Sequence, residues 1–309
     1  MFANKVKFAG ASVALATTIG LLAVSSSQSQ AQDGLISIDG SSTVFPITEA
    51  MAEEFMSDNS GINIVVGVSG TGGGFRKFCA GETSISNASR PIKDEEIEAC
   101  AENGIEPIEV LVGTDALTVV VPQDSTVFTG SNPNITLEEL NTIWSPEAEG
   151  SVTRWNQVDS SWPNAPISLF GPGTDSGTFD FFTDEVNGEE GASRADYTAS
   201  EDDNIIVLGV QRNPNAMGYF GLSYFLENED TLKALSVDGV APTPENAKNG
   251  DYALARPLFI YINPSELDRP EVEAFVNYYL ETARDTTLVT AVGYVPLTED
   301  EYNEEIDKL

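Results

Sequence analysis

Apolar runs and polar breaks alternate along the chain, first with the spacing of a strand and then with that of a helix. Residues 35–38 form a short, mainly apolar run rich in β-branched side chains, which predicts a strand. A loop of glycine, serine and threonine follows at 40–43, and apolar residues then recur at helical spacing over 47–55. Pro46 stands in the first helical turn, where proline is tolerated. The segment is therefore predicted to form a strand, a polar loop and a helix.

The same succession of strand, small-residue loop and helix occurs twice more. The strand predicted at 62–68 leads into the glycine-rich loop 69–74, and the strand predicted at 167–170 leads into the loop 171–178. The start of a helix exposes unpaired backbone N–H groups and the positive end of the helix dipole. Hydroxyl groups and glycines at that position favour an anion-binding site. One such loop alone is commonly an ordinary helix cap, whereas three together predict a site for a small oxyanion.

Strands and helices alternate over the rest of the chain, which is typical of an α/β fold with mainly parallel strand pairing. Ligands of open α/β sheets bind beyond the carboxyl ends of the strands, so we expect the three loops to converge. Residues 144–166 contain three tryptophans but are polar and irregular, and they are predicted as a surface loop. Further strands are predicted at 84–88, 108–112, 116–121, 218–222, 232–237 and 258–262, and further helices at 94–102, 269–284 and 298–309.

The N-terminal residues have the features of an export signal. Lys5 and Lys7 precede an apolar stretch at 8–24, and small polar residues follow. Ser29 and Ala31 fit the small-residue rule for cleavage, so residues 1–31 are predicted as a signal peptide cut after Ala31. A retained single-span anchor is the alternative. The mature chain is expected in the periplasm, without membrane insertion, because no other run of about 18 apolar, uncharged residues occurs.

The charge balance of the chain argues against a nucleic-acid partner. The chain has 15 basic residues and 49 acidic ones, and loss of Lys5 and Lys7 leaves a net charge of −36. Such a surface repels nucleic acids, which bind basic footprints, so no nucleic-acid partner is expected. It does not exclude an anionic ligand, because salt screens charges more than about 8–10 Å away.

Histidine and cysteine usage limits the chemistry. The chain has no histidine, which removes the Ser-His-Asp and Cys-His nucleophiles and most zinc sites. We therefore expect no metal, no cofactor and no enzymatic activity. Cys79 and Cys100 are the only cysteines, and an even count in an exported protein favours one disulfide over two free buried thiols.

Two charged residues at predicted strand ends are candidates for ligand contacts. Arg90 follows Ser89 after a strand and could offer an oxyanion a bidentate fork, or it could form a surface salt bridge. Asp115 lies between two predicted strands, where it is either a turn former or a ligand contact.

Five short motifs occur in an order that resembles a known family. They are SSTVFP at 41–46, SGTG at 69–72, ISNASR at 85–90, GTDA at 113–116 and DSGT at 175–178. Together they resemble the PstS family, the phosphate-binding subunits of phosphate ABC importers, and within it the SphX-type branch, which has a similar cysteine pair. The resemblance covers nearly all of the chain after residue 31.

The resemblance implies a fold and a mode of action. The fold would be a type II periplasmic-binding-protein fold, with two α/β domains joined by a two-strand hinge that close over the ligand. Domain 1 would comprise residues 32–115 and 257–309, and domain 2 residues 116–256. The protein would act as a monomer that binds inorganic phosphate and delivers it to ABC transporter permease subunits.

The resemblance also implies a set of ligand contacts, with two departures. Many members have an arginine just before their Ser-Gly-Thr, where this chain has Pro172 or Gly173, and an aspartate where it has Arg90. We therefore expect Arg90 to supply the positive charge, and Asp115 or Asp175 to accept the phosphate proton. The neutral contacts implied by the motifs are Ser42, Thr43, Val44 through its amide, Ser69, Thr71, Ser89, Ser176, Gly177 and Thr178.

Two alternatives stay open. One is a binder of another oxyanion, such as sulfate or molybdate, although a carboxylate at the ligand would repel fully ionised sulfate and favour phosphate. The other is a secreted hydrolase, because residues 175–178 match the Asp-Ser/Thr-Gly string of aspartic proteases. Those enzymes need two such aspartates, and the chain has no second one in that order.

Overall fold

The structure, a computed structural model, describes residues 34–130, 132–174 and 176–309. The predicted signal peptide at 1–31 and Asp175 therefore lie outside the described residues. Residues Gly34–Leu309 form one compact unit. Within the described ranges, no helix is both long enough and apolar enough to cross a membrane.

Strands occur close to the predicted positions, and two local predictions, one for a pair of strands and one for residues 144–166, are corrected below. The strands are β1 (Leu35–Gly40), β2 (Asn63–Val68), β3 (Ile85–Ala88), β4 (Ile108–Pro122), β5 (Asn134–Ile135), β6 (Ser168–Gly171), β7 (Thr198–Ala199), β8 (Ala216–Gly221), β9 (Leu232–Ala234), β10 (Ser236–Val237) and β11 (Ala255–Ile262).

Helices fill most of the connections between the strands. They are α1 (Phe45–Asp58), α2 (Thr71–Cys79), α3 (Asp94–Glu102), α4 (Leu137–Trp144), α5 (Gly177–Asn187), α6 (Asp203–Gln211), α7 (Leu222–Leu226), α8 (Pro244–Lys248), α9 (Pro270–Asp285), α10 (Leu288–Ala291) and α11 (Glu299–Ile306), with 3₁₀ turns at Pro146–Ala148, Trp155–Gln157 and Pro264–Glu266.

In the described part of the chain, nine strands form one mixed sheet in the order β2-β1-β3-β11-β4-β8-β6-β7, with β9 beside β4. Pairing is parallel at both ends, where β1 lies between β2 and β3 and β6 lies between β7 and β8. It is antiparallel in the middle, where β11 pairs with β3 and β4. The prediction of mainly parallel pairing therefore holds for the ends of the sheet and is wrong for its centre.

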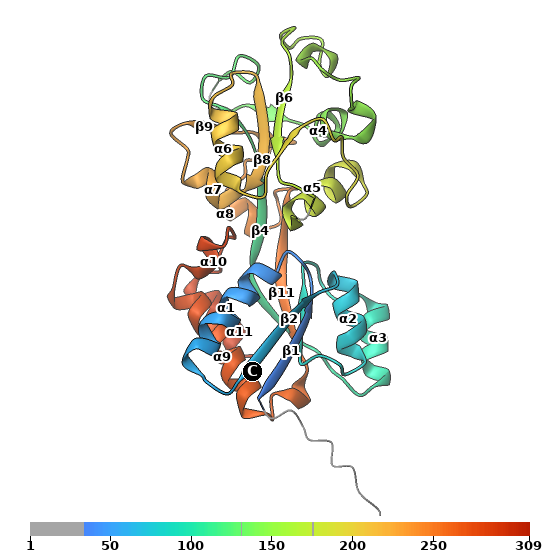
Figure 1. Cartoon of the computed structure of the whole chain (residues 1–309), viewed down its shortest axis with the longest axis vertical. Coiled ribbons are helices and arrows are strands. Elements are labelled where there is room, and N and C mark those ends of the chain that lie inside the picture. Colours follow the sequence, from blue (N-terminus) through green and yellow to red (C-terminus); the bar gives the residue numbers. More distant parts are fainter. Residues whose placement is uncertain (1–33, 131, 175) are drawn as a thin grey trace, which may run out of the picture. The chain divides into compact units, whose positions relative to one another are not determined.

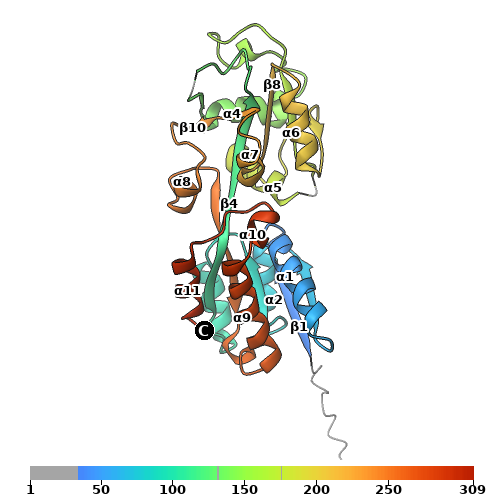
Figure 2. The same ribbon diagram turned by 90° about the vertical axis from the view of Figure 1, so that its left-hand side faces the viewer.

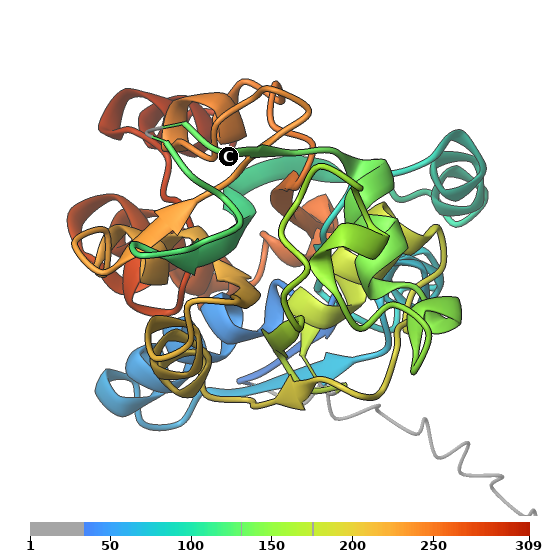
Figure 3. The ribbon, with the colours of Figure 1, turned by 90° about the horizontal axis from the view of Figure 1, so that it is seen from above.

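Two large clusters of buried side chains support this sheet. The first draws its buried members from 36–112 and 258–302, and the second draws them from 117–254. Around the first cluster, helices α1, α9 and α11 lie on one side of the strands and α2 and α3 on the other (Figures 1 and 3). Chain segments from both ends thus share one core, as the neighbouring α1, α9 and α11 in Figure 2 show.

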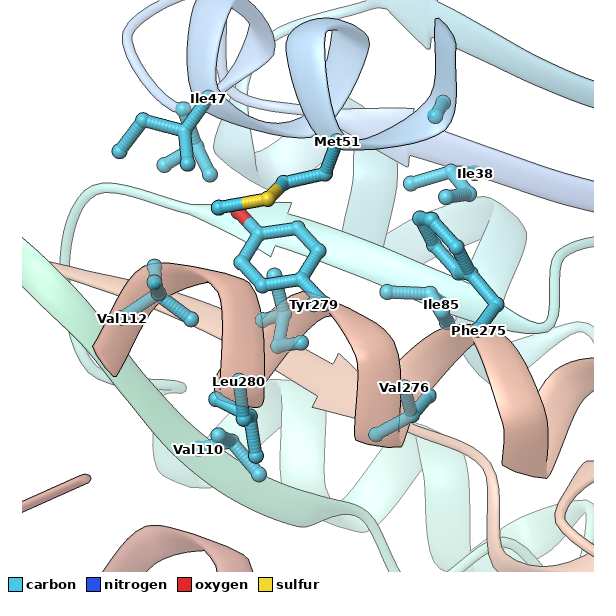
Figure 4. Close-up of a cluster of buried hydrophobic side chains, with 14 of the residues drawn as sticks. Ile38, Ile47, Met51, Ile85, Val110, Val112, Phe275, Val276, Tyr279 and Leu280 are labelled. Carbon is cyan, nitrogen blue, oxygen red and sulfur yellow. The ribbon is translucent and has the colours of Figure 1, made fainter. Parts of the chain in front are cut away.

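The contact between α1 and α9 shows how the first cluster is built. Ile47 and Met51 recur at helical spacing on α1, and Met51 reaches Tyr279 of α9, while Phe275 of α9 lies beside Ile38 (Figure 4). These side chains are fully or almost fully buried. The Tyr279 hydroxyl lies 3.2 Å from the Thr48 hydroxyl, so the polar end of this ring is also satisfied.

The first exception to the predicted strands is β4. The segments 108–112 and 116–121 were expected as separate strands around Asp115, but they form one continuous strand of 15 residues. Asp115 is neither in a turn nor exposed, because it faces Arg256 in the register of β4 and β11. Pairing with that arginine compensates the carboxylate and allows it to stay inside a buried strand.

The second exception concerns residues 144–166, which were expected as a surface loop. That prediction is wrong for Trp144 and Trp155, which are fully buried. The Trp144 ring lies 5.6 Å from that of Phe182 and 5.0 Å from that of Tyr219, both in edge-on contacts. The segment therefore belongs to the second core, and its polar residues cover these rings.

The two cysteines form the predicted disulfide, which joins the end of α2 to α3. The first residues of α2 occupy the glycine-rich segment that was expected to be a loop. Gly74 explains why this segment is rich in glycine. A Cβ at Gly74 would lie 2.6 Å from the Cα of Gly40 and 2.9 Å from the carbonyl oxygen of Asp39, so only glycine lets α2 pack this closely on β1.

Candidate functional site

A cavity of about 520 Å³ is lined by groups of residues that are far apart in the sequence. One group follows the ends of β1, β2 and β3, whose parallel pairing brings their carboxyl ends to one edge of the sheet. The other group lies on α5, on the loop after it and at the start of β11. The lining residues are Ser41, Ser42, Thr43, Gly70, Thr71, Gly72, Ser89, Arg90, Pro91, Asp180, Phe181, Asp184, Glu185, Glu190, Arg256 and Pro257.

Hydroxyl groups form one wall of this cavity. Ser42 and Thr43 lie in the loop between β1 and α1, Thr71 begins α2 and Ser89 follows β3. The Thr71 and Ser89 hydroxyls lie 3.2 Å apart, and the Ser89 amide also donates to the Thr71 hydroxyl. These four predicted contact residues are therefore brought together around one space.

Arg256 is the central cation of the cavity, and the sequence analysis did not identify it. Its Nε donates to Asp115 Oδ2 at 3.2 Å, and its Nη2 donates to Thr43 Oγ1 at 2.5 Å and to the Gly177 carbonyl at 3.2 Å. The guanidinium carbon also lies 4.0 Å from the centre of the Phe181 ring, in a cation–π contact. One side chain thus joins the loop before α1 to the first turn of α5.

Asp115 supports Arg256 from behind and does not line the cavity. Its side chain is 2% exposed. Burial raises the pKa of this carboxyl, and the charge of Arg256 and its hydrogen bond act in the opposite direction. The structure therefore places Asp115 against the arginine rather than against the space that a ligand would enter.

Arg90 also lines the cavity, and its guanidinium is held by a second carboxylate. Both terminal nitrogens donate to Glu96, each at 2.8 Å, and the Glu96 hydrogen bond raises the pKa of Arg90. The guanidinium carbon lies 5.5 Å from the centre of the Phe75 ring. The chain therefore contributes two arginines to the cavity, each paired with its own acid.

The N-terminus of α5 approaches the loop before α1 very closely. The Ser176 hydroxyl caps α5 by accepting from the Thr178 amide at 3.2 Å. A Cβ at Gly177 would lie 2.9 Å from Thr43 Oγ1 and 3.2 Å from the Thr43 amide nitrogen. Ser176, Gly177 and Thr178 are not among the described residues that line the cavity, but Gly177 reaches it through Arg256.

Two other predicted contacts are not part of the cavity lining. Val44 is fully buried at the start of α1, so only its backbone could face a ligand. The Ser69 hydroxyl donates to the carboxylate of Asp39, which also pairs with Lys77 at 2.5 Å. Ser69 thus anchors the loop before α2 to the end of β1.

Four carboxylates on α5 and the following loop line the cavity, and the sequence analysis did not identify them. Asp184, Glu185 and Glu190 are exposed, whereas Asp180 is partly buried. Burial and the charge of Glu190 raise the pKa of Asp180 to about 6, against the opposing effect of Arg256. Among the residues that the structure describes, no cluster of three acidic or thiolate side chains could hold a metal ion.

Comparisons with known proteins agree with this architecture. Residues 25–282 match the family described as a PBP superfamily domain. The chain is 50% identical to SphX of Synechococcus elongatus, covering 89% of this chain and 81% of the relative. This chain belongs to the PBP superfamily and to its SphX and PstS family. It is 38% identical to the phosphate-binding protein PstS of Staphylococcus saprophyticus, over 90% of this chain and 85% of that one.

A solved structure gives the same result for the fold of this family member. The crystal structure of a possible phosphate binding protein from Planctomyces limnophilus is 42% identical and matches with a TM-score of 0.83, covering 89% of this chain and 97% of that chain. The predicted family and the predicted α/β binding-protein fold are therefore confirmed.

Proposed function

We propose that this chain binds inorganic phosphate in the cavity described above and delivers it to the permease subunits of an ABC importer. The main structural support is the position of Arg256, whose guanidinium contacts Thr43 on one side and Gly177 on the other. A cation between two helix N-termini suits a compact oxyanion, because the helix ends and the arginine all favour negative charge. Relatives that are named as phosphate-binding proteins support phosphate as the anion.

The proposed mechanism is closure of two domains over the ligand. Domain 1 comprises residues 32–115 with 257–309, and domain 2 comprises residues 116–256. This division is supported by the two core clusters, which share no buried residue. Strands β4 and β11 pass from one core to the other and would act as the hinge. A ligand held by both domains stabilises the closed form.

The proposed contacts divide into neutral donors and charges. Arg256 supplies positive charge, as does Arg90. The α5 N-terminus closes the site from domain 2, and Ser69 orients the loop before α2. The neutral donors are the hydroxyls of Ser42, Thr43, Thr71 and Ser89, the amide of Val44, and groups of Ser176, Gly177 and Thr178.

Asp180 is the proposed acceptor for the phosphate proton. Asp115 is committed to Arg256, and Asp175 lies outside the described residues. Asp180 lines the cavity and makes no side-chain hydrogen bond or ion pair within the described ranges. A carboxylate in that position accepts a hydrogen bond from a protonated phosphate oxygen, and it repels sulfate, which has no proton to offer.

The cellular location and the monomeric state that we propose are those predicted from the sequence. The chain is exported to the periplasm, loses its signal peptide near Ala31, and works as a monomer without a cofactor. Its activity is binding and release, without turnover of phosphate esters.

Isothermal titration of the mature protein, residues 32–309, with phosphate, arsenate, sulfate and molybdate tests the proposal. We expect one phosphate site per chain and at least about 100-fold weaker binding of sulfate, since a site built to accept a proton rejects a ligand without one. Equal affinity for sulfate and phosphate would support the alternative of a general oxyanion binder. Release of phosphate from an ester substrate would support the hydrolase.

A further inference from the structure

Helix α3 contributes no residue to the cavity lining, yet one of its side chains holds an arginine that does. Glu96 Oε1 and Oε2 accept from Nη2 and Nη1 of Arg90, both at 2.8 Å. The two side chains are 16% and 32% exposed, so the pair is mostly shielded from water. A bidentate contact of this kind fixes the plane of the guanidinium as well as its position.

The donor count of Arg90 shows what remains available. A guanidinium has five N–H donors. Nη1 uses its two donors on Glu96 and on the Pro91 carbonyl, and Nη2 uses one on Glu96. The Nε donor and one Nη2 donor have no partner among the residues that the structure describes. Nη2 lies 3.8 Å from the position that a Cβ on Gly72 would take, so this end of the guanidinium faces the loop at the cavity wall.

Glu96 is itself held at several points. Burial acts to raise its pKa, but hydrogen bonds from Arg90 and from the Lys93 amide hold that pKa below the usual range, so the carboxylate stays ionised. The backbone carbonyl oxygen of Glu96 lies 3.4 Å from the Cys79 sulfur. The disulfide from Cys79 to Cys100 joins α3 to α2. Since α2 begins at the cavity with Thr71, the carboxylate and the cavity wall belong to one cross-linked unit.

We propose that Glu96 is a positioning residue for anion binding, which holds Arg90 at the cavity wall with two of its N–H donors directed toward a tetrahedral oxyanion. This inference rests on the proposed function. A free arginine side chain loses rotamer entropy when it is fixed, and the pairing with Glu96 removes much of that loss from the binding step.

The opposing explanation is that Glu96 only cancels the charge of Arg90. The two explanations predict opposite signs for removal of the carboxylate. Loss of a positioning residue weakens anion binding, whereas loss of a neutralising charge strengthens it. A purely structural ion pair would change thermal stability and leave affinity as it was.

The test is a double-mutant cycle in the mature protein with its disulfide intact, with phosphate affinity measured by titration calorimetry and thermal stability measured in parallel. We expect Glu96→Gln to weaken phosphate binding about tenfold, and to have no further effect in an Arg90→Ala background, because coupled residues are not additive. Arg90→Lys should behave like Glu96→Gln, since an ammonium cannot make the bidentate contact. Glu98→Gln is the matched control on the same helix and should leave affinity unchanged.

Unchanged or tighter phosphate binding by Glu96→Gln would overturn the positioning role, and so would additive effects of the two substitutions. If the wild-type protein bound no phosphate at all, the proposed function would fall together with this inference. If the wild type bound phosphate and Glu96→Gln bound it equally well, only the inference would fall.

Discussion

At the scale of single residues, the site depends on arginines that are each paired with a buried or half-buried acid. Asp115 holds Arg256, and Glu96 holds Arg90. A paired arginine keeps its orientation, and its remaining donors stay available to a ligand. The chain therefore places fixed positive groups in a cavity although its overall charge is strongly negative.

Replacement of Arg256 tests the proposed centre of the site. Arg256→Ala removes the cation and leaves the Asp115 carboxylate buried without its partner. We expect phosphate affinity to fall on the order of 100-fold and the free energy of unfolding to fall by about 3 kcal/mol, measured by calorimetry and urea denaturation. The double variant Arg256→Ala/Asp115→Asn should recover most of the stability but not the binding.

The control for this prediction is Arg212→Ala, an exposed arginine outside the cavity, which should change neither quantity. Recovery of phosphate affinity in the double variant would show that Arg256 only neutralises Asp115 and does not contact the ligand.

Asp180 gives a prediction with a defined pH dependence. Its pKa is raised to about 6 in the folded protein, so it is an ionised acceptor above that pH and is protonated below it. The preference for phosphate over sulfate should therefore be full at pH 7.5 and decline as the pH falls through about 6. Ionisation of Asp180 also opposes folding, because the pKa is raised, so its contribution to stability is present at low pH and is lost as the pH rises through 6.

Asp180→Asn should remove this pH dependence and reduce the preference at pH 7.5 by on the order of 100-fold, with phosphate bound more weakly and sulfate more tightly. Asp184→Asn, on the same helix but exposed, is the matched control. If Asp180→Asn and Asp184→Asn both bound phosphate and sulfate more tightly, and to the same extent, Asp180 would act only by charge repulsion.

At the scale of elements, the sequence predicts local structure well and contacts between distant segments poorly. The periodicity of α1, α3 and α9 and the motifs at the starts of α1 and α5 are local, and these elements occur where expected. Arg256 was missed because its role depends on the register of β4 with β11, which pairs residues 141 positions apart. The only local signal was a rare basic residue two positions before a predicted strand.

The buried tryptophans were misassigned for a related reason. Trp144 and Trp155 lie in a polar stretch without regular periodicity, so their burial depends on rings supplied by other segments, such as Tyr219. Where apolar residues do not recur at a regular spacing, the sequence does not indicate which side chains are buried.

Gly177 gives a prediction about how α5 meets the loop before α1. A Cβ at this position would press on the backbone and hydroxyl of Thr43, at 3.2 Å and 2.9 Å. Gly177→Ala should therefore weaken phosphate binding about tenfold, in line with the usual cost of overpacking. In the proposed open form the two domains separate and this clash is absent, and alanine is a better helix residue than glycine, so the thermal stability of the ligand-free protein should be equal or higher. A loss of stability that matches the loss of binding would contradict a specific role at this contact.

At the scale of the whole molecule, the dominant property is negative charge. Without residues 1–31 the chain carries a net charge of −36, and carboxylates line the cavity itself. This field repels an approaching anion, and salt screens it over about 8–10 Å. The attraction inside the site acts over shorter distances and is screened less.

The rate of phosphate association should consequently rise several-fold between low and physiological ionic strength. Electrostatic attraction would give the opposite salt dependence. Stopped-flow measurements of intrinsic tryptophan fluorescence can follow it. The variant Asp184→Asn/Glu185→Gln should show a weaker dependence on salt. An association rate that falls with salt would show that the arginines, and not the acidic surface, govern the approach of the ligand.

Arg256 and Asp115 face each other on the two strands that connect the cores. In the proposed closure these strands form the axis of rotation, and atoms near an axis move least. A phosphate ion would then meet the same cation in the open and closed forms, and closure would add the neutral donors of the α5 N-terminus and the Asp180 carboxylate. Attraction of the anion and the extent of rotation are thereby separable: substitutions that stiffen β4 or β11 can change how tightly and how selectively the anion is retained without changing its first contact with Arg256.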